Sequence, residues 1–272
     1  MKIAFSTLAC PGWSLEQAVE AGRRYGYDGI ELRLLDGEVI PPGLAPEQRR
    51  RIRAVCGDGG LEIAALDSSI RLAGPDSEAI EADLRAFLEL ARELEAPLVR
   101  VFGGEAPAGT PAGEASAQVV RILEETARDA ERLGVAIALE THDAYSSATA
   151  VADVLDRVGS PRAGALWDTH HPYRMGDSPE RVLELLGSRL LHVHIKDARR
   201  QDAGWQLVLL GEGEVPVRES LEAIQEAGYS GWIAVEWEKK WHPEIADPEV
   251  ALPQHLQLLR EWLQPAGTST NA

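Results

Sequence analysis

Cysteine is scarce in this chain of 272 residues, which contains only Cys10 and Cys56. Two cysteines rule out a disulfide framework, and a reducing compartment is the simplest interpretation. Apolar runs of about 18 residues, the length that a membrane-spanning helix needs, are also missing. The apolar stretch at the start of the sequence is too short for a signal peptide. We therefore expect a cytoplasmic protein with no membrane partner.

Positive charge is in deficit, because 27 Lys and Arg residues stand against 44 Asp and Glu residues, which gives a formal net charge of -17. Nucleic-acid affinity comes largely from Lys and Arg side chains that neutralise phosphates, so this balance disfavours a DNA or RNA partner. Apolar residues at 44% and charged residues at 26% are ordinary for a globular protein with a sizeable core.

Eight short β-rich segments alternate with longer helical patterns. The expected strands cover residues 3–6, 29–33, 61–66, 98–102, 135–140, 163–168, 190–195 and 232–237. The expected helices cover about residues 14–25, 46–56, 77–95, 114–133, 148–157, 179–186, 216–227 and 252–263. Parallel strands need helical crossovers, and eight such repeats are the count of a (β/α)8 TIM barrel of the α/β class.

The main rival fold is an open doubly wound sheet, which usually carries a glycine-rich phosphate turn after its first strand. Here the corresponding turn, residues 7–12, has no Gly-x-Gly-x-x-Gly pattern. No linker divides the chain, so we expect one barrel domain over residues 1–264. Residues 265–272 are expected to form a disordered C-terminal tail.

Carboxylates and an imidazole interrupt the apolar runs at the carboxyl ends of four successive expected strands. These residues are Glu140, Asp168, His194 and Glu236, with Glu238 as the fallback for Glu236. The carboxyl ends of all strands converge on one face of a barrel, where active sites of this fold lie. Such residues are costly to bury unless they are paired or bind a metal. The set suits a divalent cation: Mn²⁺, Mg²⁺, Co²⁺ or Zn²⁺.

Ordinary structural roles are the alternative for each of these residues. Glu140 can pair with Arg100 on the neighbouring strand end, and Asp168 can cap the segment that follows it. His192 points the same way as His194 along its strand, and we interpret it as an interior histidine or a group behind the metal ligand. The coincidence at four strand ends is harder to explain in this way than any single residue.

Further polar residues follow the same strand ends. His171 comes three residues after Asp168, so it could bind a second metal or a substrate hydroxyl, unless it is a solvent-exposed loop histidine. His142 holds a similar position after Glu140. The other candidates for contact with substrate are Lys196, Arg100 and, from the loop after the seventh strand, Arg200.

These motifs resemble the xylose isomerase-like TIM-barrel superfamily, and within it the sugar phosphate isomerase/epimerase group. The motifs that carry the resemblance are Ala138-Leu139-Glu140-Thr141-His142, Trp167-Asp168-Thr169-His170-His171, His192-Val193-His194-Ile195-Lys196-Asp197 and Val235-Glu236. The resemblance covers nearly the whole chain and concerns the fold and the metal site.

The ketose 3-epimerases of this group bind Mn²⁺ or a similar ion through a Glu, Asp, His and Glu set. The resemblance implies that role for Glu140, Asp168, His194 and Glu236, with Mn²⁺ as the favoured ion. It also implies that Glu140 and Glu236 form the acid–base pair, and that His171 and Arg200 contact the substrate. Barrels of this group often form dimers, so the resemblance also allows a homodimer.

The function that the resemblance implies is a divalent-metal-dependent isomerase or epimerase. It would act on a keto-sugar, a related polyol or an inosose by proton transfer through a cis-enediolate. A metal-dependent dehydratase of the inosose type and a non-catalytic metabolite-binding barrel are the alternatives. Abasic-site endonucleases of the same superfamily need histidines at the early strand ends, where this chain has Glu31, Arg33, Asp67, Arg71 and Arg100. That difference and the acidic charge disfavour DNA repair.

Overall fold

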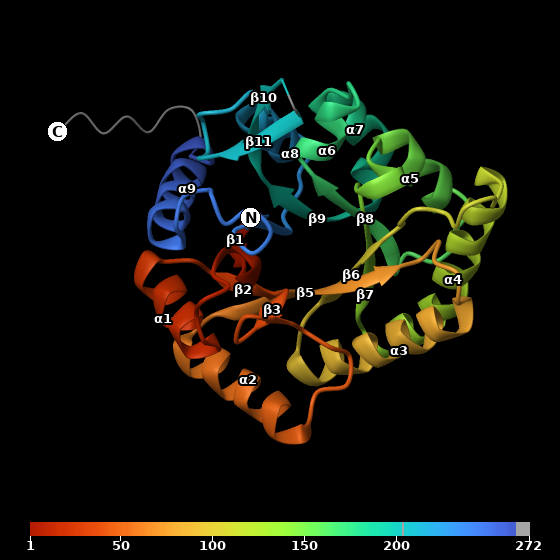
Figure 1. Ribbon diagram of the computed structural model, residues 1–272, viewed down its shortest axis with the longest axis horizontal. Helices are drawn as coiled ribbons and strands as arrows, with labels where there is room; N and C mark the ends of the chain where they lie inside the picture. Colours follow the sequence, from red (N-terminus) through yellow and green to blue (C-terminus); the bar gives the residue numbers. More distant parts are fainter. Residues whose placement is uncertain (203, 265–272) are drawn as a thin grey trace.

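A closed barrel of eight parallel strands forms the centre of the computed structural model, which describes residues 1–202 and 204–264 (Figure 1). The strands are β1 (Lys2–Ser6), β2 (Gly29–Leu32), β5 (Glu62–Arg71), β6 (Leu98–Phe102), β7 (Ala136–Glu140), β8 (Ala163–Asp168), β9 (Leu190–Ile195) and β12 (Trp232–Val235). They follow one another around the barrel in chain order, and β12 closes it by pairing with β1. The predicted (β/α)8 fold is confirmed.

Helices connect the strands and cover the outside of the barrel (Figure 1). They are α1 (Leu15–Tyr25), α2 (Pro46–Gly59), α3 (Ser77–Leu94), α4 (Ala112–Leu133), α5 (Ala148–Leu155), α6 (His170–Arg174), α7 (Pro179–Leu186), α8 (Val217–Glu226) and α9 (Pro248–Trp262). Every predicted helix is present, and the short α6 is additional. Within the described residues, no helix is both long and apolar enough to cross a membrane. The predicted tail, residues 265–272, lies outside the described residues, and the domain boundary stays a prediction.

Local sequence signals set the bounds of helix α1. The backbone N–H of Gln17 donates to Ser14 Oγ at 3.3 Å, and the backbone N–H of Ser14 donates to Gln17 Oε1 at 2.8 Å. This reciprocal capping box satisfies two donors that the helix start would otherwise leave unpaired. Gly26 ends the helix with φ at 96°, a left-handed conformation that glycine adopts without steric cost.

Two short hairpins follow strand ends and were not predicted. β3 (Leu34–Leu35) pairs with β4 (Glu38–Val39), and β10 (Asp197–Gln201) pairs with β11 (Gly204–Val208). The ring of Trp205 in β11 lies edge-on to His170, with 5.2 Å between the ring centroids. The β10–β11 hairpin therefore packs beside α6, at the carboxyl end of β8.

The barrel interior changes from apolar to ionisable along the direction of its strands. Alternate residues of a strand share a face, so Ala138 and Glu140 of β7 point the same way, as do Leu166 and Asp168 of β8. Ala138 and Leu166 pack together in a small buried cluster separate from the main core. Glu140 and Asp168 come two residues after Ala138 and Leu166 on the same faces of β7 and β8. This order places the ionisable side chains at the carboxyl end of the barrel.

Candidate active site

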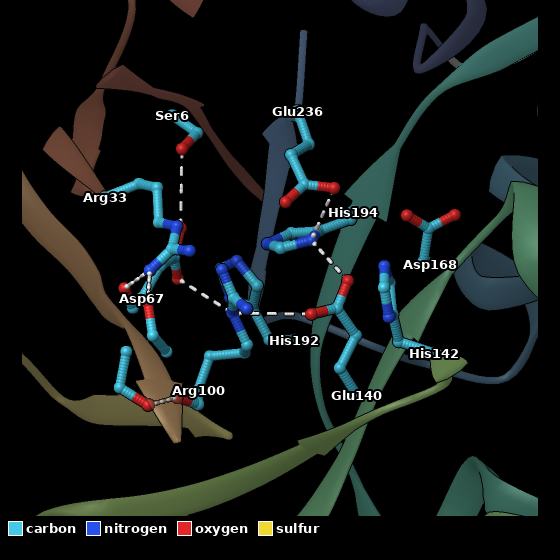
Figure 2. A network of polar contacts seen from close by, with 12 residues as sticks. Ser6, Arg33, Asp67, Arg100, Glu140, His142, Asp168, His192, His194 and Glu236 are labelled. Carbon is cyan, nitrogen blue, oxygen red and sulfur yellow. Dashed lines mark hydrogen bonds and ion pairs between the residues drawn. The ribbon is translucent and has the colours of Figure 1, made fainter. Parts of the chain in front are cut away.

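Four ionisable side chains from neighbouring strands meet at the carboxyl end of the barrel (Figure 2). They are Glu140 at the end of β7, Asp168 at the end of β8, His194 in β9 and Glu236 directly after β12. One possible ligand atom from each lies within 4.8 Å of the others, and all four residues are buried. The structure thus brings together the four residues that the sequence predicted as metal ligands.

His194 lies between carboxylates on both sides of its ring. Its Nδ1 is 3.3 Å from Glu140 Oε1 and 3.3 Å from Glu236 Oε2 (Figure 2). Its Nε2 is 3.3 Å from Glu31 Oε1 on the other side. Burial lowers the pKa of an imidazole, but the negative charges of Glu236, Glu31 and Glu140 raise the pKa of His194 well above its usual value. Each ring nitrogen therefore has its own carboxylate environment.

Lys196 brings a buried positive charge to the same cluster. Its Nζ lies 2.9 Å from Asp168 Oδ2 and 2.6 Å from Glu236 Oε2, and it also contacts Glu238 Oε1. Burial lowers the pKa of an amine, but these carboxylates raise the pKa of Lys196 well above its usual value. Glu238, the fallback ligand, thus contacts Lys196 and stands outside the four-residue cluster. The substrate contact proposed for Lys196 stays a prediction.

Arg100 connects the cluster to the early strands of the barrel. Its Nε lies 3.3 Å from Glu140 Oε2 and 3.8 Å from Asp67 Oδ1. Its guanidinium stacks on the ring of Phe102 at 4.0 Å from the ring centroid, and only 1% of the residue is exposed. Glu140 therefore forms the ion pair with Arg100 that was the alternative interpretation, and it also belongs to the four-residue cluster. Contact between Arg100 and substrate stays a prediction.

His171 and His142 lie next to each other beside Asp168. The His171 ring is 4.4 Å from the His142 ring, and its Nε2 is 3.8 Å from Asp168 Oδ2. Only 7% of His171 is exposed, so it is no solvent-exposed loop histidine. Burial lowers the pKa of His171 well below its usual value, which leaves the imidazole neutral. His142 Nδ1 forms a 2.8 Å hydrogen bond with Asp143 Oδ1.

Arg200 has no contact with the four-residue cluster among the contacts of the described residues. It is exposed on strand β10, and its backbone N–H donates to Glu214 Oε1 at 3.3 Å. Its side chain forms no hydrogen bond or ion pair with another described residue. Its role in substrate binding, implied by resemblance, stays a prediction.

Sequence reasoning gave no role to two buried carboxylates on the early strands. Glu31 in β2 contacts His192 Nε2 through Oε1, and Asp67 in β5 pairs with Arg100. Burial and the nearby charge of Glu31 raise the pKa of Asp67 to about 7. Both residues interrupt an apolar strand just as Glu140 does, and this signal could have identified them. His192 is an interior histidine, as interpreted from its position before His194.

The donor set of the four-residue cluster fits a divalent cation. Asp168 Oδ1 accepts hydrogen bonds from the backbone N–H groups of His170 at 2.7 Å and His171 at 3.3 Å, which caps the following segment as one alternative proposed. Its Oδ2 faces Lys196 Nζ at 2.9 Å. Glu140 Oε2 accepts no hydrogen bond from the described residues. Lys196 and Arg100 offset part of the repulsion among these buried carboxylates, and a divalent cation among the four ligand atoms would offset more of it.

Comparison with known proteins defines the family. The model of the family described as xylose isomerase-like TIM barrel matches residues 19–262, so this chain belongs to that family. Fructoselysine 3-epimerase of Escherichia coli O157:H7 is 25% identical over 249 residues, which cover 87% of this chain and 90% of that protein. Inosose isomerase of Bacillus velezensis is 24% identical over 251 residues, which cover 87% of this chain and 88% of that protein. Sugar epimerases and isomerases are therefore relatives of this chain.

Among solved structures, the crystal structure of the IOLI protein with a zinc atom superposes with a TM-score of 0.81. The two chains are 20% identical, and the match covers 97% of this chain and 98% of that one. At this identity the likeness establishes the shared fold.

Proposed function

We propose that this protein is a divalent-metal-dependent isomerase or epimerase of a keto-sugar or a related polyol or inosose. The observation that carries the proposal is the buried cluster of Glu140, Asp168, His194 and Glu236 at the carboxyl end of the barrel. Three carboxylates and one imidazole suit Mn²⁺, and Co²⁺, Zn²⁺ and Mg²⁺ also accept such ligands. The epimerase and isomerase relatives support the substrate class, and the zinc atom of the related structure supports a metal.

Glu140 and Glu236 are the proposed acid–base pair. A bound divalent cation would polarise the substrate carbonyl as a Lewis acid. The two glutamates enter the cluster from β7 and from the end of β12, which are separated in the barrel by β8 and β9. One glutamate takes the proton next to the carbonyl and leaves a cis-enediolate, and the other returns a proton. Return to the same carbon from the other face is epimerisation, whereas return to the neighbouring carbon is isomerisation.

Charged groups lie against both members of the proposed acid–base pair. Burial raises the pKa of a carboxyl group, but Lys196 and His194 lower the pKa of Glu236 well below its usual value, so it is ionised at neutral pH. Arg100 lies against Glu140 on the opposite side of the cluster. The neutral ring of His171 has one donor and one acceptor nitrogen, and neither is hydrogen-bonded within the described part of the chain. That pattern matches a sugar hydroxyl.

Solvent isotope exchange tests the proposed chemistry. The metal-loaded protein is incubated in D₂O with a panel of ketohexoses and inososes, and products are followed by NMR. We expect deuterium at the carbon next to the carbonyl, together with an epimer or an isomer, because the transferred proton exchanges with solvent on the glutamates. Loss of water would identify the dehydratase alternative. Tight sugar binding without any exchange would identify a non-catalytic barrel. A homodimer and a cytoplasmic location stay predictions.

A further inference from the structure

Glu31 reaches the cluster from the other side of the barrel. It lies in β2, which is separated from the β9 strand of His194 by β1 and β12. Its carboxylate is fully buried, and Oε1 faces both His194 Nε2 at 3.3 Å and His192 Nε2 in direct contact. A buried carboxylate therefore lies behind the His194 ring.

A neutral imidazole carries one proton, and the hydrogen bond of one nitrogen decides which nitrogen is free to bind a metal. For His194 the two nitrogens have different surroundings. Nδ1 faces Glu140 and Glu236 of the proposed metal cluster, whereas Nε2 faces only Glu31 among the carboxylates within 4 Å in the described part of the chain. In this structure Nδ1 forms a hydrogen bond with Glu140 Oε1 at 3.3 Å, whereas Nε2 has no hydrogen-bond partner among the described residues. A proton on Nε2 would give this buried nitrogen a partner in Glu31 and would leave the Nδ1 lone pair free for a cation in the cluster.

We propose that Glu31 is a positioning residue, whose carboxylate accepts the Nε2–H of His194 and thereby directs Nδ1 at the metal. The inference rests on the proposed function, because it needs a metal in the four-residue cluster. Carboxylates that orient metal-binding histidines in this way typically contribute about 10–100-fold to metal affinity. Glu31 would thus act on the metal only through His194.

A second metal ion is the rival explanation for the same residues. Possible ligand atoms of Glu31, His192 and His194 also lie within 4.8 Å of one another. The contact between Glu31 Oε1 and His192 Nε2 is direct, however, as in a hydrogen bond. Two ligands of one ion point at the ion and stay further apart, so the geometry favours hydrogen bonding over a second site.

The first test needs no variant and reads the proton on His194 directly. The full-length protein with ¹⁵N-labelled histidine is loaded with Zn²⁺, and the ring nitrogens are observed by NMR, with His194 assigned by loss of its signals in His194→Gln. We expect a proton on Nε2 and a metal-bound Nδ1. A proton on Nδ1 with Nε2 bound to the metal would overturn the proposal. This measurement decides the question even if variants at Glu31 fail to fold.

The second test measures Mn²⁺ affinity by electron paramagnetic resonance in wild type, Glu31→Gln and Asp67→Asn. Asp67 is a matched control, because it is also a buried carboxylate on an early strand but pairs with Arg100. We expect about 10–100-fold weaker binding in Glu31→Gln and near wild-type binding in Asp67→Asn. The melting temperature of each metal-free protein separates a loss of affinity from a loss of folding.

Three results would contradict the proposal. Unchanged affinity in Glu31→Gln would overturn it, and so would an equal loss in Asp67→Asn, which would mark a general charge effect. Two equivalents of Mn²⁺ in wild type, one of them lost in Glu31→Gln with the other unaffected, would establish the second metal site instead. If wild type binds no metal even after titration, the proposed function itself fails, and this outcome is distinct from a failure confined to Glu31.

Discussion

Replacing Glu140 with glutamine is expected to lower kcat by at least about 10³-fold, because a single acid–base group typically contributes 10²–10⁴-fold and this residue is also a proposed metal ligand. Glutamine keeps the size of the side chain but can neither take up the substrate proton nor bring a negative charge to the cation. The measurement is turnover of whichever sugar shows deuterium exchange, at saturating metal. Metal affinity is recorded in parallel, since both roles are lost together.

Glu238→Gln is the matched control for this prediction. Glu238 is a carboxylate at the same end of the barrel, but it contacts Lys196 and stands outside the four-residue cluster. We expect it to retain the metal and most of the turnover. Wild-type turnover in Glu140→Gln would reject the assignment of Glu140. A loss in Glu238→Gln as large as that in Glu140→Gln would return Glu238 to the list of candidate ligands.

Replacing Arg100 with methionine is expected to lower the free energy of unfolding by about 3–5 kcal/mol, the usual cost of removing one partner from a buried ion pair. Methionine fills much of the space but leaves Glu140 and Asp67 without the charge that faces both of them. It also removes the guanidinium that stacks on Phe102. The measurement is urea denaturation of the metal-free protein, compared with wild type.

An exposed arginine gives the control for Arg100. Arg53 Nη2 lies only 2.6 Å from Glu95 Oε1, but the side chains are 55% and 68% exposed. Arg53→Met is therefore expected to change the free energy of unfolding by no more than about 1 kcal/mol, the usual limit for surface pairs. Equal losses in Arg53→Met and Arg100→Met would show that the buried network around Glu140 does not carry the expected electrostatic cost.

The barrel and the four-residue cluster could be predicted because both depend on short-range patterns. Parallel strands buried on both faces give continuous apolar runs, and a carboxylate at the end of such a run is conspicuous. Eight strands imply a closed barrel, and a closed barrel implies that Glu140 and Glu236 approach each other despite their separation in sequence. The topology therefore supplied the long-range geometry that no local pattern contains.

The partners of Glu31 could not be predicted in the same way. Its contact with His192 crosses the barrel interior, and the chosen hydrogen-bond partner depends on side-chain packing as well as on strand order. Strand β10 was not predicted either, because three of its five residues are exposed and its sequence, DARRQ, has no alternation of apolar and polar residues. That hairpin places Arg200 on an exposed strand, whereas the sequence analysis expects it in a loop after the seventh strand.

Metal content decides whether the cluster is a metal site. Elemental analysis by mass spectrometry would compare purified wild type with the double variant Glu140→Gln/Asp168→Asn, each before and after titration with Mn²⁺ and Mg²⁺. We predict about one equivalent of a divalent metal in wild type and its loss in the double variant, because two of the four proposed ligands lose their charge. Wild-type protein that binds no divalent metal even after titration would contradict the metal-dependent mechanism.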